Sequence, residues 1–153
     1  MNNQFSLISL FVGGDFAVVS SSIIMVIMSV MSWGVIIGKT RTWARARRAK
    51  INRALPVEEI MKPFDKNLWF LSMCSTTAPF IGLFGTVWGV MNAFASIGAA
   101  KSVSIAVIAP GLAAALGTTV IGLIVAIPAT IAYQYFSKKS DDLYNELTDG
   151  KTK

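Results

Sequence analysis

The chain has 153 residues, of which 14% are charged, whereas a soluble domain of this size carries about a quarter. Its mean hydropathy is +0.59 and its net charge is +6. Because the basic residues flank apolar segments, this charge indicates membrane topology and not nucleic-acid binding. The sequence has no histidine and a single cysteine, Cys74. No histidine metal site, intrachain disulfide, cofactor site or enzymatic mechanism is therefore expected.

Three stretches without charged residues, at 16–38, 67–100 and 102–137, are long enough to cross a bilayer, which takes about 20 mostly apolar residues. We therefore predict an all-α, polytopic membrane protein with one membrane domain over residues 1–153. The three transmembrane helices are expected at about 16–38, 67–97 and 110–136.

The segments between these helices are predicted to be short. Residues 39–66 form a basic segment that Pro56 and Pro63 should interrupt. The third helix is expected to start at Pro110, since proline is favoured at the first helical position, which leaves 101–109 as an interfacial segment. The tail 137–153 is polar, and its part at 137–147 is compatible with a continuation of the third helix.

Lysine and arginine define the expected orientation, because they are enriched on the cytoplasmic side of membrane segments. They are frequent between the first and second helices and after the third, whereas only Lys101 lies between the second and third. The segment 39–66 and the C-terminus are thus predicted to be cytoplasmic and the N-terminus external. Topology alone explains the basic run at 40–53. Contact with anionic lipids is the alternative, because Arg41, Arg45 and Arg48 share one helical face.

Small residues recur every three or four positions in the second and third helices, a spacing that lets membrane helices approach closely. Gly85 and Gly89 also form a G-x-x-x-G pair. The residues predicted to pack the two helices together are Gly82, Gly85, Gly89, Ala115 and Gly122.

Each small-residue face carries a hydroxyl near its middle, from Thr86 in one helix and Thr119, or its neighbour Thr118, in the other. Counting about 20 residues from the outer end of each helix puts Thr86 and Thr119 at a similar depth. A single membrane threonine commonly bonds a carbonyl one turn back and does no more. Two hydroxyls at one depth favour the lining of a pathway. No ionisable residue lies within the three spans, so a proton pathway needs a carboxylate from a partner.

Several motifs resemble the TolQ/ExbB/MotA family of proton-driven motor subunits, and most of all its TolQ branch. They occur in the family's order and cover the second and third helices well and the first moderately. The motifs are Gly82-Leu83-Phe84-Gly85-Thr86-Val87-Trp88-Gly89, Ala109-Pro110-Gly111-Leu112-Ala113, Thr119-Val120-Ile121-Gly122-Leu123, Ala126-Ile127-Pro128-Ala129 and, more like TolQ than ExbB, Ser32-Trp33-Gly34-Val35-Ile36-Ile37.

The resemblance implies a homopentamer in the bacterial inner membrane, with the second and third helices lining a pore and the first facing lipid. A pair of single-span helices of the TolR or ExbD type would occupy the pore, each with one aspartate. Thr86 and Thr119 match the family's pore threonines. The work would maintain the envelope through a TolA-like protein, or alternatively energise outer-membrane uptake through a TonB-like protein.

Two departures from the family pattern leave a further alternative, a ring that no longer conducts. Many relatives carry a glutamate near the outer end of the third helix, where this chain has Ala114. The family also places a long cytoplasmic region between the first two helices, where this chain has only 39–66.

Overall fold

The computed structural model describes residues 16–48, 55–99 and 105–149. Predictions for 1–15, 49–54, 100–104 and 150–153 lie outside the described residues. Within those ranges the chain forms helices and no strands: α2 (Phe16–Arg48), α3 (Val57–Asp65), α4 (Leu68–Ala99) and α5 (Ile105–Asp149). Three helical segments are long and apolar enough to cross a membrane. The predicted all-α class with three spans is therefore confirmed.

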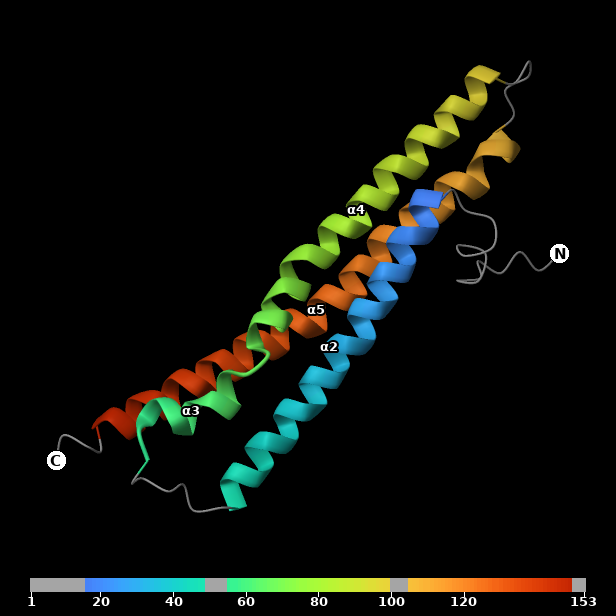
Figure 1. Ribbon diagram of the computed structural model, residues 1–153. Coiled ribbons are helices and arrows are strands. Elements are labelled where there is room, and N and C mark those ends of the chain that lie inside the picture. Colours follow the sequence, from blue (N-terminus) through green and yellow to red (C-terminus); the bar gives the residue numbers. More distant parts are fainter. Residues whose placement is uncertain (1–15, 49–54, 100–104, 150–153) are drawn as a thin grey trace.

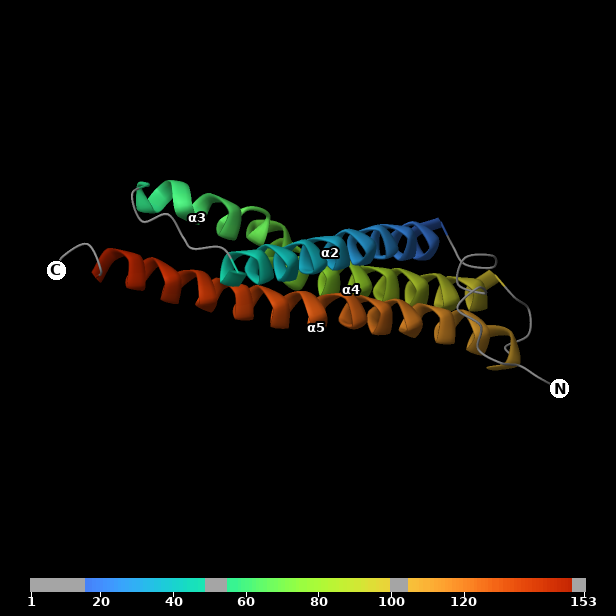
Figure 2. The same cartoon turned by 90° about the horizontal axis from the view of Figure 1, so that it is seen from below.

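The helices form an elongated bundle (Figure 1). α4 and α5 run antiparallel and lie side by side along most of their length, and α2 packs against both. α3 lies beside the C-terminal part of α5, at the end of the bundle opposite the start of α2 (Figure 2). The short α3 thus connects to α4 at the end where the basic residues of α2 lie.

α2 extends past the predicted end of the first span and reaches Arg48. The added part consists largely of alanine and arginine, which are strong helix formers. The basic run and the apolar span therefore form one continuous helix. Because the helix is continuous, the direction in which each basic side chain leaves the helix axis is fixed relative to the side chains of the apolar span.

The prediction that Pro63 interrupts the segment 39–66 is wrong, because α3 contains this residue. Proline in a helix removes one backbone donor, and α3 ends two residues later, at Asp65, so the lost hydrogen bond affects only the last part of the helix. Pro56 lies just before the first residue of α3. The chain then turns through Asn67, whose φ of 64° is a left-handed conformation that asparagine tolerates.

The third long helix begins at Ile105, so the predicted start at Pro110 is wrong. Pro110 is the sixth residue of α5, beyond the four N–H groups that lack an intrahelical partner, so its missing N–H removes one intrahelical hydrogen bond. Residues 105–109 of the expected interfacial segment are consequently helical. At the other end α5 continues to Asp149, which confirms that the polar stretch at 137–147 prolongs the third span as a helix.

Candidate functional site

The closest approach between α4 and α5 occurs where glycines of one helix face the backbone of the other. A Cβ atom on Gly82 would lie 2.8 Å from the carbonyl oxygen of Thr118, and one on Gly122 would lie 2.8 Å from that of Ala78. Real Cβ atoms essentially never come this close to another heavy atom. Glycine is therefore required at both positions for the two backbones to meet as they do.

The other predicted packing residues lie at the same contact. A Cβ on Gly85 would be 2.9 Å from the Thr118 hydroxyl, and one on Gly89 would be 2.6 Å from the Ala115 Cβ. Gly89 also faces α2, since its Cβ would lie 3.3 Å from a methyl group of Val18. By contrast, Gly111 has nothing within 4 Å and plays no part in this contact.

The three threonines named from the sequence come together at this contact. The Thr86 hydroxyl lies 3.2 Å from that of Thr118 and is hydrogen-bonded to that of Thr119. Two backbone carbonyls complete the group: Thr86 Oγ1 is 3.1 Å from the Gly82 oxygen and 3.0 Å from the Ala115 oxygen. We call these three hydroxyls and two carbonyls the threonine cluster.

The hydroxyl protons of the threonine cluster have acceptors within the chain, one proton for each hydroxyl. Thr118 donates to the Ala115 oxygen at 2.7 Å or to the Gly82 oxygen at 3.0 Å. Thr119 has the Gly82 oxygen at 3.3 Å as well as the Thr86 hydroxyl. A polar group in an apolar surrounding is costly unless it is hydrogen-bonded. The cluster satisfies this condition without any charge.

The three threonines differ in exposure. Thr118 is fully buried, at 0% exposed, while Thr86 and Thr119 are half-buried. Thr118 is thus enclosed between the helices, and its role is to hold α4 against α5. Thr86 and Thr119 lie at the edge of the contact, where a molecule outside the chain can reach them.

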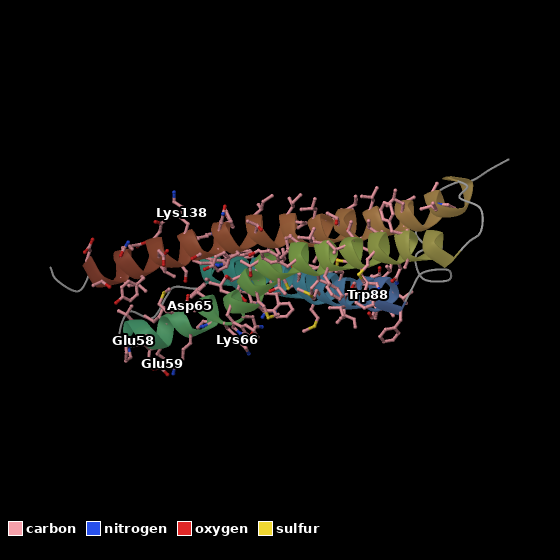
Figure 3. All side chains as sticks on the ribbon, turned by 90° about the horizontal axis from the view of Figure 1, so that it is seen from above. Glu58, Glu59, Asp65, Lys66, Trp88 and Lys138 are labelled. Atoms are coloured by element: carbon pink, nitrogen blue, oxygen red, sulfur yellow. The ribbon has the colours of Figure 1, made fainter. Side chains whose placement is uncertain are left out.

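Large apolar side chains are exposed on the faces of α4 and α5 that no other described part of the chain covers. Phe84 and Trp88 of α4 contact each other, with ring centroids 6.0 Å apart, and Trp88 lies on the surface of the bundle (Figure 3). In water such faces would be unfavourable. They fit lipid or other transmembrane helices. Members that are more than half exposed include Phe80, Val87, Phe94, Val120, Ile124 and Ile131.

A second polar group, not anticipated from the sequence, lies where α2, α3 and α5 meet. Lys39 is only 4% exposed, and its ammonium group donates a hydrogen bond to the Phe64 carbonyl at the end of α3. The buried Ser140 of α5 donates to the Asp65 carboxylate at 2.6 Å. Trp43 packs on Phe64 with ring centroids 4.5 Å apart. We call these five residues the Lys39 cluster.

The Lys39 cluster joins three helices. The Lys139 ammonium lies 4.5 Å from the centroid of the Trp43 ring, a cation–π distance, so α5 contacts α2 here directly. An apolar face on α3, made by Ile60, Met61 and Phe64, is buried against these neighbours. The spacing of the apolar residues at 60, 61 and 64 is typical of one buried face of a helix, so the sequence could have indicated this face. No local pattern pairs Asp65 with Ser140, because they are 75 positions apart.

Comparisons with known proteins agree with the motifs. The family model described as the MotA/TolQ/ExbB proton channel family matches residues 38–149. The Tol-Pal system protein TolQ of Pseudomonas aeruginosa is 46% identical over 100 residues, which cover 65% of this chain and 41% of that protein. TolQ of Haemophilus influenzae is 43% identical over 93 residues, covering 61% and 38%.

ExbB proteins match over a similar region. The biopolymer transport protein ExbB of Neisseria gonorrhoeae is 38% identical over 119 residues, which cover 70% of this chain and 54% of that protein. The chain thus spans about half, or less, of the length of these relatives. The matched region contains α3, α4, α5 and the end of α2. With its three spans and the family model matched across most of its length, the chain belongs to the MotA/TolQ/ExbB proton channel family.

Proposed function

We propose that the chain is a motor subunit of the bacterial inner membrane that forms a ring and uses the proton gradient together with a single-span partner. The observation that carries this proposal is the pair of half-buried hydroxyls, Thr86 and Thr119, at the edge of the α4–α5 contact. Hydroxyl groups at a membrane midplane accept and donate hydrogen bonds without the cost of a buried charge.

The partner has to supply the group that carries the proton. Neither α4 nor residues 105–137 of α5 contain a charged side chain, and a hydroxyl holds no net charge at neutral pH. A partner helix with one carboxyl group provides the missing ionisable site, and the uncovered apolar faces of α4 and α5 suit a transmembrane helix as a neighbour. We propose a TolR-like or ExbD-like partner within a homopentamer.

The segment 32–37, which resembles TolQ more than ExbB, favours a Tol-Pal-type complex with a TolA-like protein as the next component. Percentage identity does not separate the two branches: the two TolQ proteins are 46% and 43% identical, and the ExbB of Salmonella typhimurium is 47% identical over a shorter stretch of 70 residues. An ExbB-type role that drives TonB-dependent uptake is the alternative. In either case the N-terminus is periplasmic and the C-terminus cytoplasmic, as the lysine and arginine distribution predicts.

In the first test, the chain is co-expressed with a TolR-like or an ExbD-like partner and purified in nanodiscs. Native mass spectrometry then determines the subunit composition of the complex. We expect a ring of copies that holds the TolR-like chain. Retention of the ExbD-like chain alone would favour the ExbB-type role. A ring that excludes both partners would favour the alternative of a ring that no longer conducts. The absence of a carboxyl group at Ala114 would provide a reason for that loss.

The second test measures proton flux through the complex in liposomes. Thr86→Val and Thr119→Val should lower flux, because valine keeps the shape of threonine and removes the hydroxyl. The matched control is Thr130→Val, since among the described residues Thr130 bonds only the Ala126 carbonyl one turn back, at 2.8 Å. Unchanged flux in both test variants would contradict the proposed pathway, and so would flux that persists after replacement of the partner's carboxyl group.

A further inference from the structure

One face of α2 is turned toward the rest of the bundle. Its residues are small, polar or flexible, and they are buried against α4 and α5 or, near the end of the helix, against α3. Lys39 and Trp43 end this face, and both belong to the Lys39 cluster. The buried residues are Ala17, Val18, Ser21, Ser22, Met25, Met28, Ser32, Lys39 and Trp43.

The opposite face of α2 is uncovered in the described part of the chain. At 3.6 residues per turn, its members lie within about 40° of one line along the helix. The face is apolar over the membrane span and ends in two arginines, all of them exposed. We call it the outer stripe, and its members are Ile23, Ile27, Val30, Gly34, Ile37, Arg41 and Arg45.

Arg41 and Arg45 differ from Lys39 in having no partner among the residues that the structure describes. α2 contains no acidic residue, and neither arginine forms an ion pair with any residue that the structure describes. The described acidic side chains belong to α3 and to the C-terminal part of α5. The same helix therefore turns one cation inward, where a carbonyl receives it, and leaves two cations on its outer face.

The two arginines are suitably placed for a phosphate group. They are one turn apart, or about 6 Å along the axis, and the guanidinium fork matches the oxygens of a phosphate. Helical side chains lean toward the helix N-terminus, which here means toward Ile37 and the apolar part of the stripe. A Cβ on Gly34 or Gly38 would meet nothing within 4 Å. A hydrocarbon chain can therefore lie directly against the backbone next to the arginines.

We propose that the outer stripe binds an anionic phospholipid, with the phosphate between Arg41 and Arg45 and an acyl chain along Val30, Gly34 and Ile37. The order along the stripe, apolar and then cationic, matches the order of tail and headgroup in such a lipid. A second copy of the chain fits this face less well, because its own charges here are also positive. The proposal is independent of the ring and of proton conduction.

In the test, the purified chain, with any partner that it retains, is mixed in detergent with equimolar phosphatidylglycerol and phosphatidylcholine. Native mass spectrometry then counts the lipids that remain bound. We expect a preference for phosphatidylglycerol of about thirtyfold, since two basic residues near a membrane surface contribute about 1 kcal/mol each and 1.4 kcal/mol corresponds to a factor of ten. Arg41→Gln/Arg45→Gln should abolish this preference, and Arg41→Lys/Arg45→Lys should retain part of it, because it keeps the charge and loses the fork.

The matched control is Lys62→Gln/Lys138→Gln, which removes the same charge from exposed residues of α3 and α5. Lys138 lies on the other side of the bundle from Glu58, Glu59 and Lys66 (Figure 3). The control should keep the wild-type preference. Three results would overturn the proposal. The first is no preference in the wild-type chain, and the second is an equal loss in Arg41→Gln/Arg45→Gln and in the Lys62→Gln/Lys138→Gln control. The third is that Arg41→Gln/Arg45→Gln loses copies from the assembly while its lipid binding is unchanged.

Discussion

The threonine cluster and the Lys39 cluster show two ways of placing polar groups in the same bundle. The first lies between α4 and α5 and consists of hydroxyls and carbonyls alone. The second lies at one end of the bundle, joins three helices and contains an ammonium and a carboxylate. Charge is costly in the middle of a membrane and much less so near its surface. Each cluster therefore uses the chemistry that its depth permits.

The two clusters also differ in how they depend on the backbone. The threonine cluster requires glycine at Gly82 and Gly122, because any Cβ there would meet a carbonyl oxygen of the other helix at 2.8 Å. The Lys39 cluster is built mainly by side chains that come from three helices. We expect substitutions in the first to affect the whole bundle and substitutions in the second to affect mainly α3.

The largest effect is expected from Gly82→Ala. The added methyl group would push α4 away from Thr118 and Thr119, and overpacking of this kind costs about 1–3 kcal/mol. Thermal unfolding of the purified chain in detergent measures the loss. Gly111→Ala is the control, since nothing lies within 4 Å of its Cβ and alanine is the better helix former. Equal melting temperatures for the two variants would contradict the close contact.

Lys39→Met should come next, because its local cost is similar to that of Gly82→Ala but its effect is confined to one end of the bundle. The variant keeps much of the apolar stem and removes the charged hydrogen bond to the Phe64 carbonyl, a kind of bond worth about 1.5–3 kcal/mol. Hydrogen exchange should accelerate at least about tenfold in α3, since 1.4 kcal/mol corresponds to a factor of ten. Exchange in the middle of α4 should stay the same. Arg41→Met, which removes an exposed cation two residues away, should leave α3 unchanged.

Thr118→Val is expected to be milder, because a hydrogen bond between membrane helices contributes about 0.6 kcal/mol on average. Thr118 is fully buried, so no water replaces the lost bond, and the free energy of unfolding should fall by about this amount. Proton flux should persist in the complex, in contrast to Thr86→Val. If Thr118→Val stopped flux while stability was retained, the separation between the enclosed and the accessible threonines would be wrong.

Much of this arrangement was predictable from the sequence, and the reason is periodicity. Charge-free stretches located the three spans, and small residues at spacings of three and four identified the faces of α4 and α5 that meet. Gly82, Thr86 and Thr119 could be identified in this way, because the small-residue spacing that marks each of them lies within its own helix. The sequence predicts the start of α5 too late, because a proline near a helix start is typical of the first helical position, whereas Pro110 lies five residues after it.

The Lys39 cluster could not be predicted in the same way. A lysine at the end of an apolar stretch is usually a topology signal with its charge in solvent, and nothing in the neighbouring sequence indicates that Lys39 is buried. Its burial depends on α3 folding back, which in turn depends on the turn at Asn67. The contact between Asp65 and Ser140 depends on the tertiary structure in the same way.

Ser140→Ala should have the smallest effect of the series, and for that reason it separates the two clusters most clearly. The bond from Ser140 to Asp65 is short, at 2.6 Å, but the carboxylate belongs to an exposed residue and water can replace the lost donor. Alanine also has a higher helix propensity than serine, by a few tenths of a kcal/mol. The two contributions oppose each other, so the free energy of unfolding should change by less than about 0.5 kcal/mol. Thr118→Val loses its bond where no water can enter. A stability loss for Ser140→Ala as large as that for Thr118→Val would show that the end of the bundle is as closed to water as its middle.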